Sequence, residues 1–260
     1  VRPTAFGELI AMTHKCWSAV ALSPSILNPI INKLYSMPDL VIAVSSLVKD
    51  LIPNKSVVLH PRPPELDALL RIPIGDKMPW VCYSGAFIPI KGVQKIPEIA
   101  REVIKEVGGE VRFILIGGSS RDPLGSYVTR KAHEYGIENH INIIGHMPRG
   151  ELLRLKRKCL IYIQPSLFDA FPIVVIEAMA LGSIPIVTKY VGSKDIIAHV
   201  DADLITDLSP SSIAKVIIRL LNSDILLRDL SRSVREAVSK YLSSTNLTRE
   251  VSSLINQCLS

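Results

Sequence analysis

From residue 80 to the C-terminus, the chain alternates between two patterns, namely short continuous apolar runs and segments with apolar residues at helical spacing. Runs rich in β-branched residues, such as VRFILIGG at 111–118 and IPIVT at 184–188, are typical of buried strands. Between such runs apolar residues recur at helical spacing, as in Ile96, Ile99 and Val103. We predict strands at 80–85, 111–118, 141–145, 160–164, 184–188 and near 203–205, and helices at about 96–107, 125–135, 151–158, 172–181, 210–222 and 224–241.

Strands that alternate with helices predict an α/β fold with a parallel, doubly wound sheet. Such sheets bind their ligands outside the carboxyl ends of the strands. Gly85, Gly117 and Gly145 each follow a predicted strand at that edge, and Pro165-Ser166 follows another. We therefore expect a binding cleft along this edge, with the three glycines beside the ligand.

The first 79 residues are less regular. Apolar fragments broken by Pro24 and Pro29 predict short helices within residues 1–35. The proline-rich run at 61–79 predicts a linker between two units, 1–60 and 80–260. Within the first unit we predict a strand at 39–45, a helix at 46–52 and a strand at 56–60.

The stretch PSLFDAFPIVVIEAMALGSIPIVT at 165–188 carries the most information about function. Pro172 suits the first position of a helix, because its φ is fixed and its missing N–H would have no partner there. The helix that follows is apolar nearly all round, so we expect it to be buried. Gly182 suits the left-handed residue that ends a helix. The stretch therefore predicts a loop, a buried helix, a tight turn and a buried strand.

Glu177 is an anomaly in this helix, because a buried carboxylate is costly unless it is paired or accepts hydrogen bonds. One interpretation is a buried ion pair. The other is a ligand site, since the segment from Phe171 through Pro172 to Ile173 places free backbone N–H groups at a helix N-terminus, which favours phosphate. Asp169 stands just before that segment. Donors for a diphosphate beside carboxylates for hydroxyl groups are what a sugar nucleotide needs.

The run from Asp169 to Glu177, with the Gly182 turn and the strand behind it, resembles the acid-x7-Glu signature of the GT-B glycosyltransferases of the group 1, family 4-like type. Pro165-Ser166 also fits that pattern. The resemblance covers most of residues 80–260 and, more weakly, 39–61. It implies two Rossmann-like domains, with the C-terminal donor-binding domain present here and the N-terminal domain incomplete, since most of it would precede residue 1.

The resemblance also implies roles for individual residues. Glu177 matches the residue that binds the ribose hydroxyls, and Asp169 matches the carboxylate, usually Glu, that holds the sugar. Lys91 matches a lysine that binds the donor diphosphate. With the helix N-terminus, Lys91 would stabilise the charge that builds up on the leaving diphosphate. We therefore predict Lys91 and Asp169 as the catalytic residues.

Two positions depart from the family pattern, namely Asp169, where the family usually has Glu, and Ala86. Ala86 stands where the family has an arginine that also binds the diphosphate. Loss of one charge-assisted hydrogen bond weakens binding by roughly ten-fold. Arg121 and Lys194 are candidates to supply the missing charge.

The net charge of +6 fits an anionic cosubstrate or an acidic membrane surface. The sequence has no basic stripe interleaved with aromatic residues, so nothing in it indicates nucleic acid as a partner. The basic run Arg154, Lys156, Arg157 and Lys158, with Arg149 before it, is typical of a solvated helix face. Peripheral contact with a membrane is the alternative interpretation of that run.

The four cysteines, Cys16, Cys82, Cys159 and Cys258, show no metal-ligand spacing. We therefore predict reduced, mostly structural thiols in a cytoplasmic protein, and no metal site.

Three hypotheses for function follow. The first is a glycosyltransferase that uses a nucleotide-diphosphate sugar (UDP-, GDP- or ADP-sugar) as cosubstrate and an unknown glycan, lipid or protein as acceptor. The resemblance implies that it needs no metal and retains the anomeric configuration. The second is a non-catalytic donor-binding subunit or remnant that needs a separate partner for the acceptor, favoured by Ala86 and the incomplete first domain. The third is a sugar-nucleotide epimerase, for which we find no specific residue set.

Overall fold

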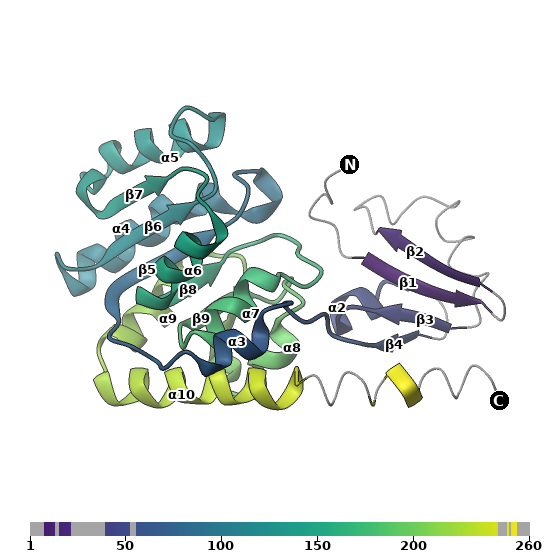
Figure 1. Ribbon diagram of the computed structural model, residues 1–260. Helices are drawn as coiled ribbons and strands as arrows, with labels where there is room; N and C mark the ends of the chain where they lie inside the picture. The colour runs from purple at the N-terminus through teal and green to yellow at the C-terminus, as the bar shows by residue number, and fades with distance from the viewer. Residues whose placement is uncertain are drawn as a thin grey trace.

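The computed structural model describes residues 8–13, 16–21, 40–52, 56–243, 249 and 251–253. It contains a four-stranded sheet near the N-terminus and a six-stranded sheet in the rest of the chain (Figure 1). The sequence-based α/β prediction is confirmed by the larger sheet, in which every neighbouring pair of strands is parallel.

The larger sheet has the strand order β10-β9-β8-β5-β6-β7. The chain moves outward from β5 through β6 to β7, and then returns to place β8 on the other side of β5. This reversal between β5 and β8 is a topological switch point, where open α/β sheets bind ligands. The strands are β5 (Met78–Ser84), β6 (Arg112–Ile116), β7 (Ile141–Ile144), β8 (Cys159–Gln164), β9 (Ile184–Thr188) and β10 (Ile205–Thr206).

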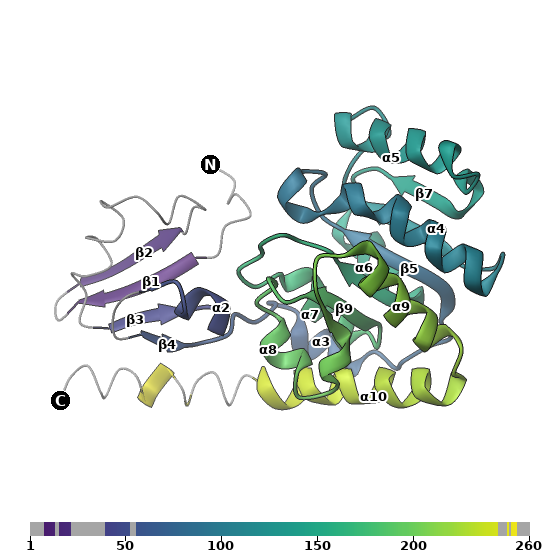
Figure 2. The ribbon, with the colours of Figure 1, turned by 180° about the vertical axis from the view of Figure 1, so that it is seen from behind.

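Helices cover both faces of this sheet. α4 (Ile96–Val107) packs against α9 (Pro210–Leu221) on one face, and both stand in front of the sheet in Figure 2. α7 (Ile173–Ala180) packs on the other face with α3 (Leu66–Arg71), α6 (Arg149–Lys158) and α10 (Asp224–Tyr241). The remaining helices are α5 (Pro123–Glu134) and α8 (Lys194–Ile197), with short 3-10 turns at η1 (Pro89–Lys91), η2 (Val93–Lys95), η3 (Glu138–His140) and η4 (Ala202–Leu204).

Burial on both faces explains why the strands appear in the sequence as continuous apolar runs. All five residues of β9 are buried, and so are nearly all of β6 and β8. The elements predicted between residues 80 and 241 are all present, with ends shifted by a few residues. The strand expected near 203–205 differs most for its length. Ala202–Leu204 form a 3-10 turn instead, and β10 starts at Ile205.

The prediction of helices within residues 1–35 is wrong for its described part. β1 (Glu8–Thr13) and β2 (Cys16–Ala21) form an antiparallel hairpin, and β1 also pairs with β3 (Leu40–Ala43). Short apolar runs do not distinguish a strand from a helix, so pairing with β3 decides the outcome. The rest of 1–35 lies outside the described residues. α2 (Ser46–Lys49) and β4 (Ser56–Val58) complete this unit.

The proline-rich segment 61–79 contains a helix that composition concealed. Leu66 and Leu69 of α3 are buried, and α3 packs against α7. Arg235 of α10 donates hydrogen bonds to the carbonyl oxygens of Leu70 and Ile72 (2.6 Å to Ile72). The segment is therefore fixed to the larger sheet's helical layer.

The prediction of reduced thiols is wrong for two of the cysteines. Cys82 of β5 and Cys159 of β8 form a disulfide, with Cα atoms 6.0 Å apart. The sequence hid this contact because the two residues are 77 positions apart, and only the return of the chain to β5 makes their strands neighbours.

Candidate functional site

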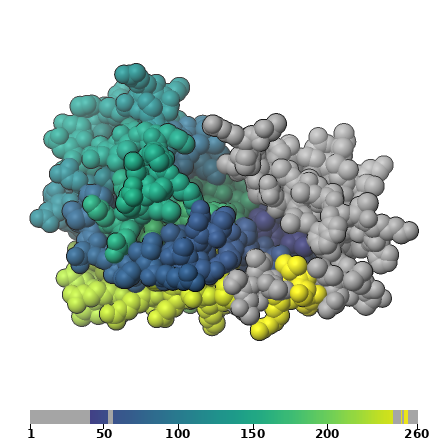
Figure 3. All heavy atoms as spheres, viewed as in Figure 1, coloured from purple at the N-terminus to yellow at the C-terminus, as the bar shows by residue number. Residues whose placement is uncertain are grey.

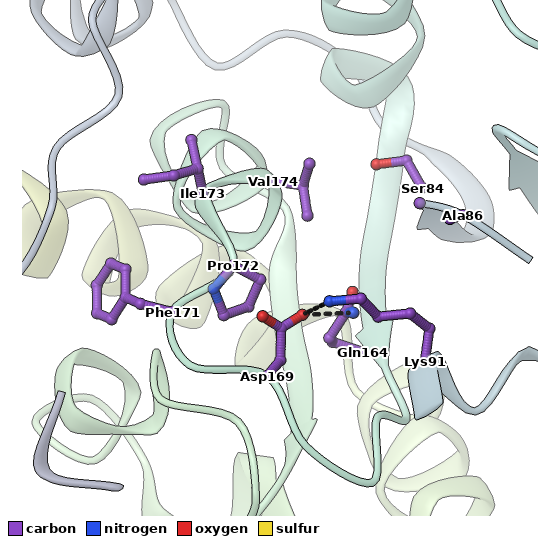
Figure 4. Close-up of a pocket in the computed structure, with 10 residues that line it drawn as sticks. Ser84, Ala86, Lys91, Gln164, Asp169, Phe171, Pro172, Ile173 and Val174 are labelled. Carbon is purple, nitrogen blue, oxygen red and sulfur yellow. Dashed lines mark hydrogen bonds and ion pairs between the residues drawn. The ribbon is translucent and has the colours of Figure 1, made fainter. Parts of the chain in front are cut away.

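A cavity of about 290 Å³ opens at the switch point, at the carboxyl ends of β5 and β8 (Figure 4). It combines residues that follow β5, the last residue of β8 and the start of α7. The lining residues are Ser84, Gly85, Ala86, Lys91, Gln164, Asp169, Phe171, Pro172, Ile173 and Val174. The edge predicted to bind a ligand therefore carries a cavity.

An ion pair between Lys91 and Asp169 lies in this cavity. The Lys91 Nζ is 2.6 Å from Asp169 Oδ2, and each residue is only 7% exposed. Gln164 donates a second hydrogen bond, 3.3 Å long, to the same carboxylate oxygen (Figure 4). Among the described residues that line the cavity, Lys91 is the only cation and Asp169 the only carboxylate.

Close backbone contact places Lys91. Lys91 ends η1, and Gly92 follows with a φ of +75°, a backbone conformation that residues other than glycine rarely adopt. A Cβ atom at Gly92 would stand 1.9 Å from the Pro165 carbonyl oxygen. The Leu167 N–H also donates to the Ile90 carbonyl (2.8 Å). The Lys-Gly pair thus allows the Lys91 loop to lie directly against the loop that leads to Asp169.

Asp169 is held by its own backbone. Its N–H donates to Tyr190 (3.0 Å), and its carbonyl accepts from Gly192 (2.8 Å). The run 191–195 leads into α8. Burial raises the pKa of the Asp169 carboxyl, whereas Lys91 and Gln164 act in the opposite direction. Asp169 is therefore a buried carboxylate that depends on its partners for its charge.

The N-terminus of α7 faces the same cavity. Pro172 is the N-cap residue, one position earlier than predicted, because its ψ of 108° is extended and the helix begins at Ile173. No side chain caps this end, so the first N–H groups of the helix have no intrahelical partner. Partial positive charge of this kind favours an anion. Gly182 ends the helix with a φ of +79°, as predicted.

Glu177 is fully buried, and each of its carboxylate oxygens has a cationic partner. Arg149 Nη2 lies 2.7 Å from Oε1, and Lys156 Nζ lies 2.8 Å from Oε2. Arg149 also pairs with Glu65 (2.6 Å). The hydrogen bonds to Glu65 and to Glu177 both raise the pKa of Arg149. The interpretation of 149–158 as a solvated face is wrong at Lys156, which is completely buried. Burial lowers the pKa of Lys156, against the effect of Glu177.

Comparison with known families matches this region of the chain. The family described as Glycosyl transferases group 1 matches residues 71–237, more than half of the sequence. The chain belongs to this family. Group 1 membership agrees with the resemblance carried by residues 165–188.

Relatives of this group 1 chain extend well beyond its length. It is 26% identical over 163 residues to an uncharacterized glycosyltransferase, MJ1178, of Methanocaldococcus jannaschii, covering 61% of the chain and 43% of the relative. It is 30% identical over 159 residues to a D-inositol 3-phosphate glycosyltransferase of Corynebacterium glutamicum, covering 60% and 37%. The match therefore spans less than half of either relative.

Solved structures share the fold of this group 1 chain. The structure of Anabaena Alr3699/HepE in complex with UDP superimposes with a TM-score of 0.72 at 15% identity. The superposition covers 91% of this chain and 70% of that one. The likeness confirms the GT-B type of fold.

Most of the predicted site residues of this group 1 chain meet at one place. Six of them line the cavity, namely Gly85, Lys91, Asp169, Phe171, Pro172 and Ile173. Gly117 lies beside them, since a Cβ on it would stand 2.7 Å from the Gly85 carbonyl oxygen. Gly145 and Glu177 are not among the lining residues, and neither are Arg121 and Lys194, the cations expected to compensate for Ala86.

Sequence reasoning missed Gln164 and Ser84. Gln164 is buried and bonds Asp169, and its Oε1 atom has no partner among the described residues. Ser84 bonds the Tyr162 hydroxyl (2.8 Å). Both residues are polar and end an apolar strand at the ligand edge, and that position is the signal that could have revealed them.

The described residues contain neither a membrane-spanning helix nor a cluster of metal ligands. No helix in that part of the chain is long and apolar enough to cross a bilayer. No three His, Cys, Asp or Glu residues among those described are grouped in a way that could hold a metal ion.

Proposed function

We propose that this chain binds a nucleotide-diphosphate sugar and transfers the sugar to an acceptor, with retention of configuration and without a metal. The observation that carries the proposal is the Lys91–Asp169 pair beside the free N-terminus of α7, in one cavity at the switch point. Membership of the group 1 family gives the reaction class.

Lys91 is suited to a diphosphate even though it is paired. An ammonium group has three N–H donors, and the Lys91 Nζ donates one hydrogen bond to a side chain, that of Asp169. Its other donors and the N–H groups of Ile173 and Val174 would contact phosphate oxygens. As the bond to the sugar breaks, these groups would stabilise negative charge on the leaving diphosphate.

Asp169 would hold sugar hydroxyls with its carboxylate. The ion pair with Lys91 favours the ionised form of this buried group, and the ionised form accepts hydrogen bonds from hydroxyls. Gln164 Oε1, which has no partner among the described residues, would accept a further hydroxyl. We propose UDP as the first nucleotide to test, because UDP is the nucleotide in the Anabaena HepE complex.

Calorimetric titration of UDP, GDP and ADP into the wild-type chain and Lys91→Met tests the donor site. We expect one nucleotide to bind, with affinity reduced at least ten-fold in the variant. Lys105→Met is the matched control, because Lys105 is an exposed lysine of α4 outside the cavity. Absence of binding of all three nucleotides to the folded wild type would contradict the proposal.

Transfer itself needs a second measurement. Release of the nucleotide from the matching sugar donor, with and without chelator, tests turnover and metal independence. The anomeric configuration of the released or transferred sugar, followed by NMR, tests retention. Nucleotide binding without any release would instead support the donor-binding subunit, which the replacement of an arginine by Ala86 also favours.

A further inference from the structure

A second, larger cavity lies at the opposite edge of the parallel sheet. Its volume is about 550 Å³. It is lined by Lys77, just before β5, by Leu160 near the start of β8, and by the first turns of α10. β5 spans seven residues, so this cavity and the Lys91–Asp169 cavity lie roughly 20 Å apart along the strand.

Two layers of the fold form the walls of this second cavity. The segment that leads into β5, blue in Figure 3, lies against α10, yellow-green, on the face shown. Arg235 of α10 bonds the carbonyl oxygens of Leu70 and Ile72, which fixes the two layers together. The cavity is therefore part of the folded structure.

Cations predominate in the second cavity. Lys77, Arg228 and Arg232 line it, with Asp76 and Asp224 as the acids. Neither Arg228 nor Arg232 forms an ion pair with another residue of the described part of the chain, and both are exposed residues that line the cavity. Two unpaired guanidinium groups one helical turn apart match the geometry of a phosphate group.

The acids add a second kind of contact. Within residues 56–243 neither Asp76 nor Asp224 forms an ion pair, and both line the same cavity. Carboxylates without a cation accept hydrogen bonds from hydroxyl groups. Guanidinium groups and carboxylates around one cavity together suit a small molecule that carries both a phosphate and several hydroxyls.

We infer that this second cavity binds a phosphorylated sugar, with Lys77, Arg228 and Arg232 on the phosphate and Asp76 and Asp224 on the hydroxyls. The site is separate from the proposed donor site and does not depend on the proposed function. Both its position at the amino ends of the strands and its charge distinguish it from the Lys91–Asp169 cavity.

Lys77 gives the site a measurable signature. Its Nζ donates to the Leu181 carbonyl (2.8 Å) and contacts Ser183 Oγ (3.4 Å). Burial, with Arg157 and Arg235 nearby, lowers the pKa of Lys77 to about 7. A bound phosphate would favour the charged amine, so binding near pH 7 should take up about half a proton at this residue.

The site also contacts α7 at the end remote from the donor cavity. Lys77 bonds the Leu181 carbonyl, and Ser231, which lines the second cavity, bonds the Gly182 carbonyl (2.7 Å). A ligand that competes for Lys77 or Ser231 would change the hydrogen bonds at the C-terminal end of α7. We therefore expect altered hydrogen exchange in the peptide that contains 173–182.

The test is calorimetric titration of glucose 6-phosphate, inorganic phosphate and glucose into the whole chain, in two buffers of different ionisation enthalpy. We expect glucose 6-phosphate to bind most tightly, with proton uptake at pH 7. Arg228→Gln/Arg232→Gln should lose at least ten-fold in affinity, and Lys77→Met should lose the proton uptake. Lys105→Met should match the wild type.

Several results would overturn the inference. No binding of glucose 6-phosphate at millimolar concentration is one. Equal binding of inorganic phosphate or of glucose is another, since it removes the role of one half of the site. Unchanged affinity in Arg228→Gln/Arg232→Gln would place the ligand elsewhere. The arginine variant keeps the test valid if Lys77→Met does not fold.

Discussion

Lys91 Nζ lies 2.6 Å from Asp169 Oδ2, although 78 positions separate the two residues in the sequence. Both are buried at the switch point between β5 and β8, where Gln164 also bonds the carboxylate. The pair leaves the cavity with little net charge, so in the proposed donor site the remaining ammonium donors and the N-terminus of α7 would attract the anion. We therefore expect stability and the proposed nucleotide binding to depend on the same two side chains.

Lys91→Met should lower the free energy of unfolding by about 3 kcal/mol at pH 7, because it leaves a buried carboxylate without its cation. Burial already raises the pKa of Asp169, so the folded variant binds a proton more readily than the unfolded chain. Its stability should therefore fall as pH rises above the ordinary aspartate pKa of about 3.9.

The control for this prediction is Lys91→Met/Asp169→Asn, which lacks the titrating carboxyl. Its stability relative to the wild type should show no such fall at this site, and at pH 7 it should exceed that of Lys91→Met. Urea unfolding at several pH values measures both differences. Equal pH profiles for the single and double variants would show that Asp169 is not a buried, Lys91-dependent carboxylate.

Ala86→Arg should increase nucleoside diphosphate affinity. Ala86 lines the Lys91–Asp169 cavity at the position where the resembled family has arginine, and Lys91 is the only cation among the described lining residues. One added charge-assisted hydrogen bond should tighten binding by roughly ten-fold. The gain in affinity should decrease at high salt, because salt screens the attraction between the added arginine and the diphosphate. Titration of UDP measures the change.

Ala86→Gln is the matched control, since glutamine adds a long polar side chain without charge. It should show little of the gain. If glutamine and arginine have the same effect, the missing family arginine does not limit binding in this chain.

Lys156→Met should cost about 3 kcal/mol of unfolding free energy, because Lys156 is fully buried against Glu177. Lys158→Met, two positions along the same helix, removes an exposed lysine and should change stability by only about 0.5 kcal/mol or less. Denaturant midpoints of the two variants give the comparison. Similar midpoints would mean that Glu177 does not need Lys156.

The larger sheet was predictable because it is buried on both faces. β6 and β9 appear as uninterrupted apolar runs, and Gly182 has the left-handed conformation that its position after α7 suggested. The same periodicity predicted the edge of the sheet that carries the Lys91–Asp169 cavity, with Gly85 beside it. Lys91 and Asp169 were predicted as site residues from the resemblance to the family, because they match positions of its motifs.

Contacts between distant parts of the chain were not predictable in this way. Lys156 belongs to a basic run that is typical of a solvated face, and only the packing of α6 against α7 buries it beside Glu177. Gln164 is the polar last residue of a predicted strand, and only the tertiary fold brings the Asp169 loop beside it. Strand order, which sets these neighbours, leaves no mark on local periodicity.

The Cys82–Cys159 disulfide depends on the same strand order, and it should stabilise the larger sheet. It closes a loop of 77 residues, for which the chain-entropy relation gives about 4.5 kcal/mol. Cys82→Ala/Cys159→Ala should unfold at correspondingly lower denaturant concentration, and reductant should shift the wild type but not this variant. Peptide mapping without reductant should recover the segments around Cys82 and Cys159 as one linked species. Recovery of both cysteines as free thiols, from protein purified without reductant, would contradict the disulfide and restore the expectation that all four cysteines are reduced.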